Sequence, residues 1–339
     1  MVDGPSTPAP APNLVDRFVR WAVGAAVFGA LLYLGGSVWA GFDDMRAAFV
    51  AFDWRLIPLL VALTLTNYGL RFLKWHYFLG RLKVPMPFIE DLWNFLAGLA
   101  MVISPGKAGE LLKPYVVRAR TGTPMATTIP ALVSERLTDA IAMLALAGIS
   151  VTTYAADKVV YVVAPLVVVA VGLAVLAHEG LTLSALRLMG RLPMVGRVVP
   201  KLEEMVRATR ICLAPVPFVV SITLSFGAWF AECVAYWLVL RGLDLAASLD
   251  VSVFIYAAAT VIGAPAPGGL GVSDGALAVF ASTLVGAPQS LAVASALITR
   301  VVTLWFGVGV GAVALLRVSR MLGGAIDLDD RADDAPPAA

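Results

Sequence analysis

Two proline- and glycine-rich breaks, each set inside apolar sequence, constrain the fold of this chain more than any other feature. The first break runs from Ser104 to Lys113 and the second from Ala264 to Asp274. An α-helix does not continue through such prolines and glycines, so each break ends one helix and allows another to begin. Interruptions at corresponding places in two halves of a membrane protein are typical of transporters built from inverted repeats.

The composition places the chain in a membrane. Of its 339 residues 60% are hydrophobic and only 14% are charged, and the mean hydropathy is +0.86. A soluble globular domain carries about 25% charged residues. The formal net charge of +2 gives no electrostatic basis for binding nucleic acid. The two cysteines form neither a metal-ligand spacing nor a disulfide framework, and we expect no metal and no cofactor.

Apolar stretches of two lengths predict the architecture. Full spans are expected at residues 21–40, 56–79, 127–151, 159–177, 217–240 and 291–316. The apolar runs that precede the breaks, 92–103 and 251–263, are too short to cross a hydrocarbon core of about 30 Å as helices. We therefore expect an all-α integral membrane protein with about six spanning helices and two re-entrant helical hairpins. The alternative of eight spans, with each hairpin helix crossing fully, is left open.

The distribution of basic residues predicts the orientation. Basic residues follow the second span at 81–83, fill the segment 178–210 and close the last span at 317–320. The positive-inside rule places these segments in the cytoplasm, and it places the loop at 41–55, which has no positive excess, outside. The first hairpin then enters from the cytoplasm and the second from outside, which is an inverted-topology repeat. Both termini are expected in the cytoplasm, with the protein in the cytoplasmic membrane, such as a bacterial inner membrane.

The same patterns divide the chain into segments. We expect a disordered tail at 1–15, a first membrane repeat at 16–178, a cytoplasmic basic linker at 179–212 and the remainder of a second repeat at 213–320. The second repeat begins with the span at 159–177. Residues 321–339 form an acidic tail that is expected to be disordered.

Charged residues inside or beside the spans are the candidate substrate-binding residues, because intramembrane charges usually line a pathway. They are Arg71, Lys107, Glu110, Lys113, Glu135, Arg136, Asp139, Glu232, Asp274 and Arg300. Snorkelling to the interface is the competing interpretation for Lys74 and Arg71, and a structural ion pair is the alternative for the stretch around Glu135. An unpaired Arg300 would be costly, so we expect it to pair with Asp274 or Glu232. His76 is expected to play a plain interfacial role.

The breaks themselves supply candidate backbone or hinge residues. In the first break these are Pro105, Gly106 and Gly109, and in the second they are Pro267, Gly268, Gly269 and Gly271. Glycine allows the backbone to approach a ligand or another helix closely. Simple close packing of helices is the alternative for the glycines of the second break.

The two breaks and the next charged stretch resemble a known family, the lysylphosphatidylglycerol synthase transmembrane region or flippase-like domain. Its Pro-Gly-x-x-Gly-Glu-x-x-Arg pattern falls on residues 105–113, its Glu-Arg-x-x-Asp on 135–139, and its Pro-Gly-Gly-x-Gly on 267–271. Lys113 stands where arginine is usual and Asp274 where glutamate is expected. Lysine at 113 weakens any claim of bidentate phosphate binding. The resemblance covers about residues 20 to 320.

The resemblance implies movement of a lipid or a lipid-linked glycan across the bilayer. We expect a non-enzymatic, flippase-like transporter that moves an anionic head group by alternating access, with a phospholipid or a polyprenyl-phosphate-linked lipid as its partner. The basic residues of the candidate set would hold the phosphate, and the acidic residues would hold the basic ones or bind a coupling proton. Two alternatives are a membrane-embedded transferase acting on a lipid-linked substrate and a secondary transporter for a soluble anion.

Overall fold

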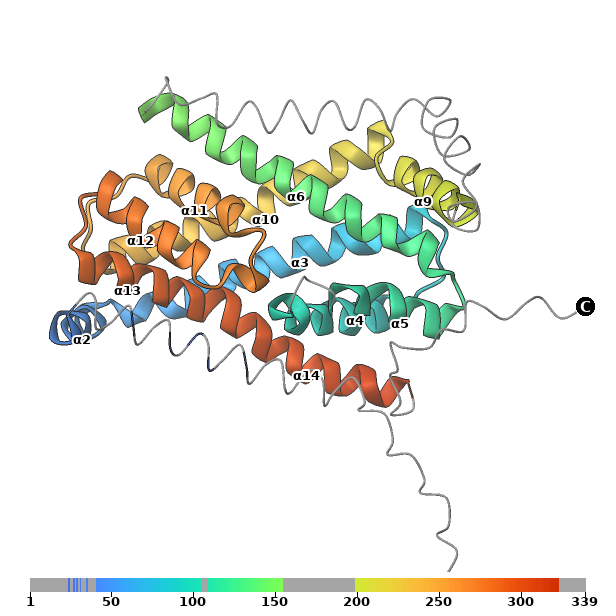
Figure 1. Cartoon of the computed structure of the whole chain (residues 1–339), viewed down its shortest axis with the longest axis horizontal. Helices are drawn as coiled ribbons and strands as arrows, with labels where there is room; N and C mark the ends of the chain where they lie inside the picture. The colour runs from blue at the N-terminus through green and yellow to red at the C-terminus, as the bar shows by residue number, and fades with distance from the viewer. Residues whose placement is uncertain are drawn as a thin grey trace, which may run out of the picture.

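The computed structural model describes residues 41–104, 109–154 and 199–322, with isolated helical positions between residues 24 and 35. In these ranges every regular element is a helix, so the all-α class is confirmed (Figure 1). Several predictions lie outside the described residues. They concern most of the span at 21–40, the span at 159–177, the linker up to residue 198, both tails, and Pro105, Gly106 and Lys107.

Most helices form two sets of similar layout. The first set is α2 (Phe42–Ala51), η1 (Trp54–Leu56), α3 (Ile57–Arg81), α4 (Phe88–Ala100), η2 (Met101–Ile103), α5 (Leu112–Thr121) and α6 (Met125–Tyr154). The second is α9 (Val199–Cys212), α10 (Pro215–Gly242), α11 (Leu249–Gly263), η5 (Pro267–Gly269), α12 (Val272–Leu284), α13 (Gln289–Arg300), η6 (Val301–Trp305) and α14 (Phe306–Met321). In the described part, three helical segments are long and apolar enough to cross a bilayer: Trp54–Arg81, Pro215–Gly242 and Gln289–Met321.

Both interrupted segments form hairpins whose tips meet inside the protein. The four hairpin helices, α4, α5, α11 and α12, contain 13, 10, 15 and 13 residues, too few to cross a bilayer. The tips η2 and η5 pack against each other, and Ile103 Cγ2 lies 3.3 Å from the position that a Cβ atom on Gly268 would take. The prediction of two re-entrant hairpins is therefore confirmed, and the eight-span alternative does not fit.

The two halves run in opposite directions. Helix α3 packs along α10, and the Asp53 amide at the start of α3 donates to the Gly242 carbonyl at the end of α10 (3.0 Å), so the two helices are antiparallel. The hairpins enter from opposite ends of the molecule (Figure 1). Each hairpin packs on a long helix of the other half, α4 on α14 and α11 on α6. This exchange is the inverted-topology arrangement that the sequence predicts.

The first tip is closed by a side chain and a glycine. The Ser104 hydroxyl donates to the Met101 carbonyl (2.6 Å) and accepts from the Gly109 amide (2.9 Å). A Cβ atom on Gly109 would stand 2.6 Å from Ser104 Oγ and 2.8 Å from Met101 Cβ. Glycine is required there because the returning chain passes too close for a side chain.

The second tip relies on left-handed backbone. Gly268, Gly269 and Gly271 have φ values of 58°, 71° and 77°, a region that L side chains rarely adopt. Pro267 begins the short helix η5 between α11 and α12. The Asp274 carboxylate accepts from the Gly271 amide (2.7 Å) and so fixes the start of α12.

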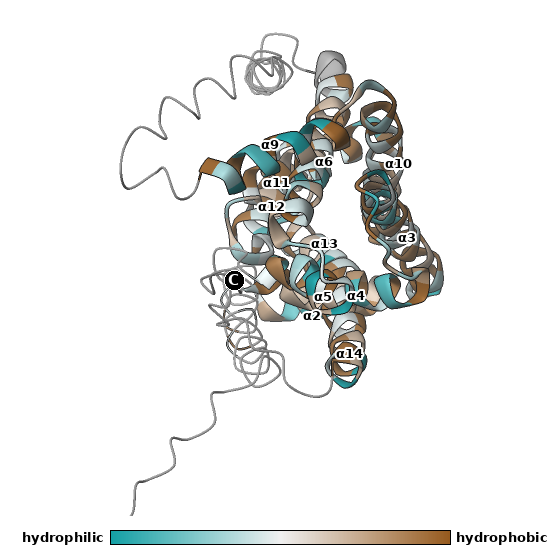
Figure 2. Ribbon diagram, turned by 90° about the vertical axis from the view of Figure 1, so that its right-hand side faces the viewer, coloured by the Kyte–Doolittle hydropathy of each residue, from teal (hydrophilic) through white to brown (hydrophobic). Residues whose placement is uncertain are grey.

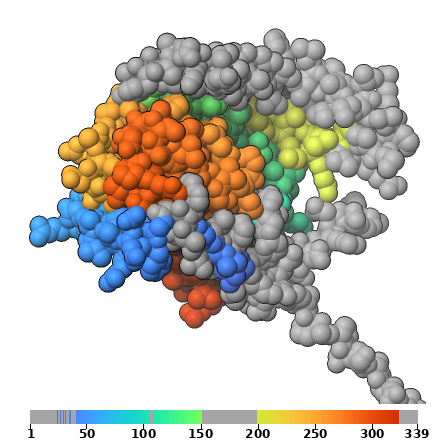
Figure 3. Space-filling view, turned by 60° about the vertical axis from the view of Figure 1, so that its left-hand side comes forward, coloured from blue at the N-terminus to red at the C-terminus, as the bar shows by residue number. Residues whose placement is uncertain are grey.

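Two short helices lie at the ends of the bundle. The expected external loop at 41–55 contains α2, which packs on α13; the end of the molecule with α2, α12 and α13 is seen in Figure 3. Buried Met45 and Ala48 on one face explain why this charged segment is helical. Helix α9 packs on α6 and is largely hydrophilic in Figure 2.

Candidate functional site

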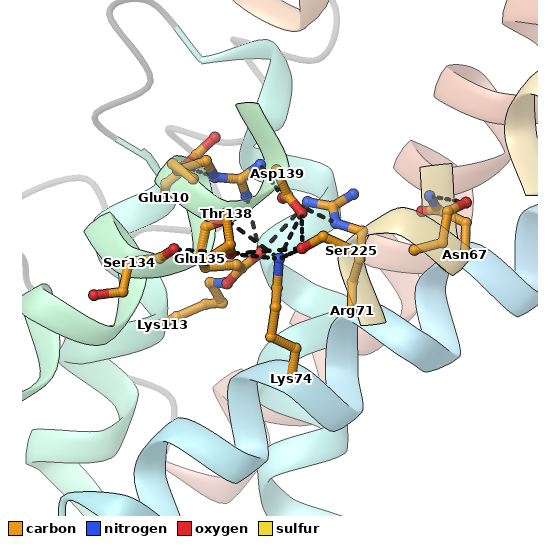
Figure 4. A network of polar contacts seen from close by, with 12 residues as sticks. Asn67, Arg71, Lys74, Glu110, Lys113, Ser134, Glu135, Thr138, Asp139 and Ser225 are labelled. Carbon is orange, nitrogen blue, oxygen red and sulfur yellow. Dashed lines mark hydrogen bonds and ion pairs between the residues drawn. The ribbon is translucent and has the colours of Figure 1, made fainter. Parts of the chain in front are cut away.

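A cluster of charged side chains lies where the first hairpin meets α3 and α6 (Figure 4). We call it the central cluster; its members are Arg71, Lys74, Glu110, Lys113, Glu135, Arg136 and Asp139. All of them except Arg136 are buried. Helix α3 supplies two members, the return of the hairpin supplies two and α6 supplies three. The structure thus brings together six of the candidate residues named from the sequence.

Glu135 is the centre of the cluster. Its carboxylate accepts from Lys113 Nζ (2.5 Å) and lies 3.5 Å from Arg71 and 3.4 Å from Arg136. The side chain is completely buried. A buried carboxylate needs compensating charge, and here three cations from three elements provide it.

Lys74 and Asp139 form the second buried pair. Lys74 Nζ donates to Asp139 Oδ1 (2.5 Å) and to Ser225 Oγ (2.7 Å). It also reaches the Glu135 carbonyl (3.2 Å) and Thr138 Oγ1 (3.3 Å). The snorkelling interpretation of Lys74 is therefore wrong, because α6 and α10 enclose its ammonium group and supply oxygen acceptors.

Arg136 is the least buried member of the cluster. Its Nε lies 3.0 Å from Glu110 Oε2, and 34% of its side chain is accessible. Because Arg136 also approaches Glu135 and Asp139, it connects the surface of the cluster with the buried pairs.

Aromatic rings and a glycine hold Lys113 in place. Its Nζ lies 4.3 Å from the centre of the Trp75 ring and 5.2 Å from that of Phe95. A Cβ atom on Gly98 would stand 3.1 Å from Lys113 Cγ, so the missing side chain leaves room for the lysine stem. The lysine ammonium is thus placed as a compact point charge between these rings and Glu135 of α6.

The central cluster carries more positive than negative charge. Its four cations, Arg71, Lys74, Lys113 and Arg136, face three carboxylates, Glu110, Glu135 and Asp139. Four positive charges minus three negative charges leave one positive charge among the described members. A buried excess charge is costly, and an anionic ligand would neutralise it.

The second tip carries a separate ion pair. Arg300 Nε donates to Asp274 Oδ1 (2.5 Å), which confirms the expected pairing of Arg300 with Asp274. Arg300 Nη2 is buried without a hydrogen-bond partner among the described residues. A Cβ atom on Gly269 would stand 2.8 Å from that same nitrogen, so the arginine lies directly against the tip.

Glu232 belongs to neither ion pair. It is buried in α10, and its Oε2 accepts a hydrogen bond from the Tyr256 hydroxyl of α11 (2.5 Å). Within the described ranges no cation lies at ion-pair distance from it. The sequence predicts that Glu232 is either protonated or paired with a basic residue. The structure shows no such pairing among the described residues.

His76 has an acidic partner that the sequence did not reveal. Its Nδ1 lies 2.8 Å from Asp91 Oδ2, and Trp75 Nε1 donates to Asp91 Oδ1 (2.8 Å). Asp91 is fully buried in the first turn of α4. The expectation of a plain interfacial role missed this contact, which attaches the base of the first hairpin to α3.

Residues 21–311 match the family described as "Lysylphosphatidylglycerol synthase TM region". The chain belongs to this family. A UPF0104 membrane protein from Methanothermobacter thermautotrophicus is 22% identical over 306 residues, covering 84% of this chain and 89% of the relative. Most of both membrane halves thus falls inside the lysylphosphatidylglycerol synthase TM region family, and the resemblance stated from the motifs is confirmed.

Membership of this family corrects one prediction. We expected a protein that is not an enzyme, but the lysylphosphatidylglycerol synthase TM region family is named after a synthase, which is an enzyme. The prediction relied on the lack of a recognisable metal site, nucleophile pair or nucleotide loop in the sequence. The lack of these motifs does not show whether a membrane region takes part in a reaction.

Proposed function

We propose that this protein binds the anionic head group of a membrane lipid at the central cluster and moves it across the cytoplasmic membrane by alternating access. The observation that carries the proposal is the excess of one positive charge in a buried cluster beside the tip of a re-entrant hairpin. Non-helical backbone at membrane depth occurs where protein covers it or where it lines a watery cavity. A phosphate group supplies the negative charge that this position lacks.

The arrangement of the tips supports alternating access. The tips η2 and η5 touch each other, and the helix that follows each tip holds a charged residue paired with a long helical segment, Lys113 with α6 and Asp274 with the segment Gln289–Met321. Rearrangement of one half against the other would open the cluster to either side in turn. The family name makes phosphatidylglycerol and its derivatives the first lipids to test, and polyprenyl-phosphate lipids the second.

A second candidate function is transfer of a chemical group to a lipid-linked substrate within the membrane. The observation that favours it is the name of the family, a synthase. The central cluster would then position the head group for the reaction. Product analysis of the lipids after reconstitution separates this function from movement alone, because a transferase changes the mass of the lipid.

Reconstituted protein tests the proposed movement. We expect vesicles containing the protein to translocate fluorescent phosphatidylglycerol, measured by its accessibility to a membrane-impermeant quencher. Arg136→Gln should slow translocation by about tenfold or more, because a hydrogen bond to a charged group contributes about 1.5–3 kcal/mol. The control is Arg120→Gln, which removes an exposed cation paired with Glu90 (2.8 Å) outside the cluster.

Three lipid classes and one soluble anion separate the outcomes. Movement of phosphatidylglycerol or a polyprenyl phosphate supports the proposal, and equal movement of zwitterionic phosphatidylcholine speaks against recognition of charge. Uptake of inorganic phosphate without movement of any lipid would replace the proposal with a soluble-anion transporter. Wild-type protein that moves none of these molecules would overturn it.

The proposed orientation can be tested with single cysteines. Arg81 and Ser282 are exposed at opposite ends of the described bundle, while the native Cys212 and Cys233 are buried. Because arginine and lysine gather at the end with Arg81, we expect Arg81→Cys to be labelled from the cytoplasm and Ser282→Cys from outside. An impermeant maleimide applied to intact cells should therefore label only Ser282→Cys. Labelling of Arg81→Cys alone would show that the protein has the opposite orientation.

A further inference from the structure

Glu232 differs from every other buried carboxylate around the two tips. Glu110, Glu135, Asp139 and Asp274 each have a lysine or arginine nitrogen within 2.5 to 3.0 Å. Glu232 has a tyrosine hydroxyl instead. A carboxylate that is removed from water and not paired with a cation is far more stable with its proton bound. The conformation seen here therefore suits Glu232 with its proton bound.

The groups around Glu232 come from four neighbouring helices. Tyr256 of α11 donates a hydrogen bond to it, and Tyr68 and Arg71 of α3, Asp139 of α6 and Arg300 of α13 lie close enough to interact with it electrostatically. Cys233 is its neighbour on α10. Two of these groups are cations, and both are already engaged in the conformation observed. An ionised Glu232 would attract one of them.

Arg71 is the more loosely held of the two cations. It lies 3.5 Å from Glu135 and 3.7 Å from Asp139, and its Nε has no hydrogen-bond partner among the described residues. Arg300, by contrast, donates to Asp274 at 2.5 Å. Arg71 is therefore the cation that can change partners at the lower cost.

The packing already places Arg71 beside the face of α10 that carries Glu232. The Arg71 guanidinium carbon lies 5.3 Å from the centre of the Trp229 ring. Trp229 and Glu232 are three residues apart on α10, a spacing that puts both on one face of a helix.

We propose that Glu232 is a proton-binding site that couples proton uptake to anion binding at the central cluster. This inference rests on the proposed function, since it concerns the same cluster. When Glu232 is protonated, Arg71 stays with Glu135 and Asp139, and the cluster keeps its single excess positive charge. When Glu232 loses its proton, its carboxylate pairs with Arg71, the cluster becomes neutral overall and the anion is released. Proton and anionic head group thus bind and leave together.

Binding of a short-chain lipid to the purified full chain tests this coupling. We choose dihexanoyl phosphatidylglycerol and a weakly buffered solution with a pH indicator dye. Wild-type protein should take up protons as the lipid binds, and its affinity should fall by about tenfold per pH unit once Glu232 is ionised in the ligand-free protein. Glu232→Gln should bind the lipid without proton uptake and without this pH dependence, because the amide imitates the protonated acid.

Two further variants keep the test decisive. Tyr256→Phe removes the hydrogen-bond donor that favours the carboxylate, so the pH at which affinity begins to fall should move upward. His76→Gln is the matched control: it removes an imidazole that contacts Asp91 outside the central cluster and should leave the pH dependence unchanged.

The outcomes separate this inference from the proposed function. Lipid that binds wild-type protein equally at all pH values, without proton uptake, would overturn the coupling and leave the proposed function standing. Retention of the full pH dependence in Glu232→Gln would also overturn the coupling. Phosphatidylglycerol that neither binds nor moves at any pH would overturn both.

Discussion

Replacing Lys74 with methionine is expected to destabilise the protein by about 3–5 kcal/mol, the cost of breaking a buried ion pair by removing one partner. Lys74 is fully buried, and its ammonium group donates to Asp139, Ser225 and Thr138. Methionine fills a similar volume, so the loss comes from leaving Asp139 buried with cations no closer than 3.7 Å. Equilibrium unfolding in mixed micelles measures the change in the free energy of unfolding.

The matched control for Lys74→Met is Arg120→Met, which breaks an exposed ion pair with Glu90. Exposed pairs contribute only about 0–1 kcal/mol, so this control should unfold almost like the wild type. The double variant Lys74→Met with Asp139→Asn should recover part of the lost stability, because it removes the uncompensated charge. Equal effects of Lys74→Met and Arg120→Met would contradict the burial of the Lys74 pair.

Much of the architecture could be predicted from the sequence because membrane proteins obey strict length and charge rules. Short apolar runs next to Pro105 and Pro267 predicted hairpins, and the alternation of basic ends predicted their opposite directions. The long helices begin and end within a few residues of the expected limits. The second break could be predicted because Pro265 and Pro267 lie in an apolar run that no continuous helix would carry.

Partners that depend on tertiary packing could not be predicted. The basic residues Arg71 and Lys74 are three apart on α3, but nothing in that spacing reveals that α6 and α10 cover Lys74. Asp91 meets His76 only because the first hairpin folds back along α3. A π-helical turn, η6, directly follows Arg300, and its Thr303 carbonyl accepts a hydrogen bond from the Tyr68 hydroxyl (2.5 Å). No sequence motif indicated this turn.

The short helices were missed for a different reason. Helix α2 has acidic residues in its first turn and a glycine before it, which are recognised start signals. Its 10 residues are too few to cross a membrane, so the length rule for spans does not detect it. The segment that contains α9 was predicted to be a cytoplasmic linker, mainly because of its positive charge. Spans therefore dominated the prediction, and amphipathic helices at the ends of the bundle were read as loops.

Gly311 provides the second large expected effect. Helix α14 packs against α4 so closely that a Cβ atom on Gly311 would stand 2.3 Å from the Ala100 amide nitrogen and 2.9 Å from the Leu96 carbonyl oxygen. These are backbone atoms, so no side chain can turn away to make room. Gly311→Ala must push α4 from α14, and we expect a loss of about 1–3 kcal/mol or more in the free energy of unfolding.

Gly309→Ala is the control on the same helix, since nothing lies within 4 Å of the position its Cβ would take. Alanine is the better helix former by about 1 kcal/mol, so this variant should be neutral or slightly more stable. Because α4 leads directly to Ser104 at the first tip, Gly311→Ala should also slow head-group translocation, whereas Gly309→Ala should not. If both variants behaved alike, α4 could not be held against α14 by backbone contact, and the first hairpin would not depend on the opposite half for its position.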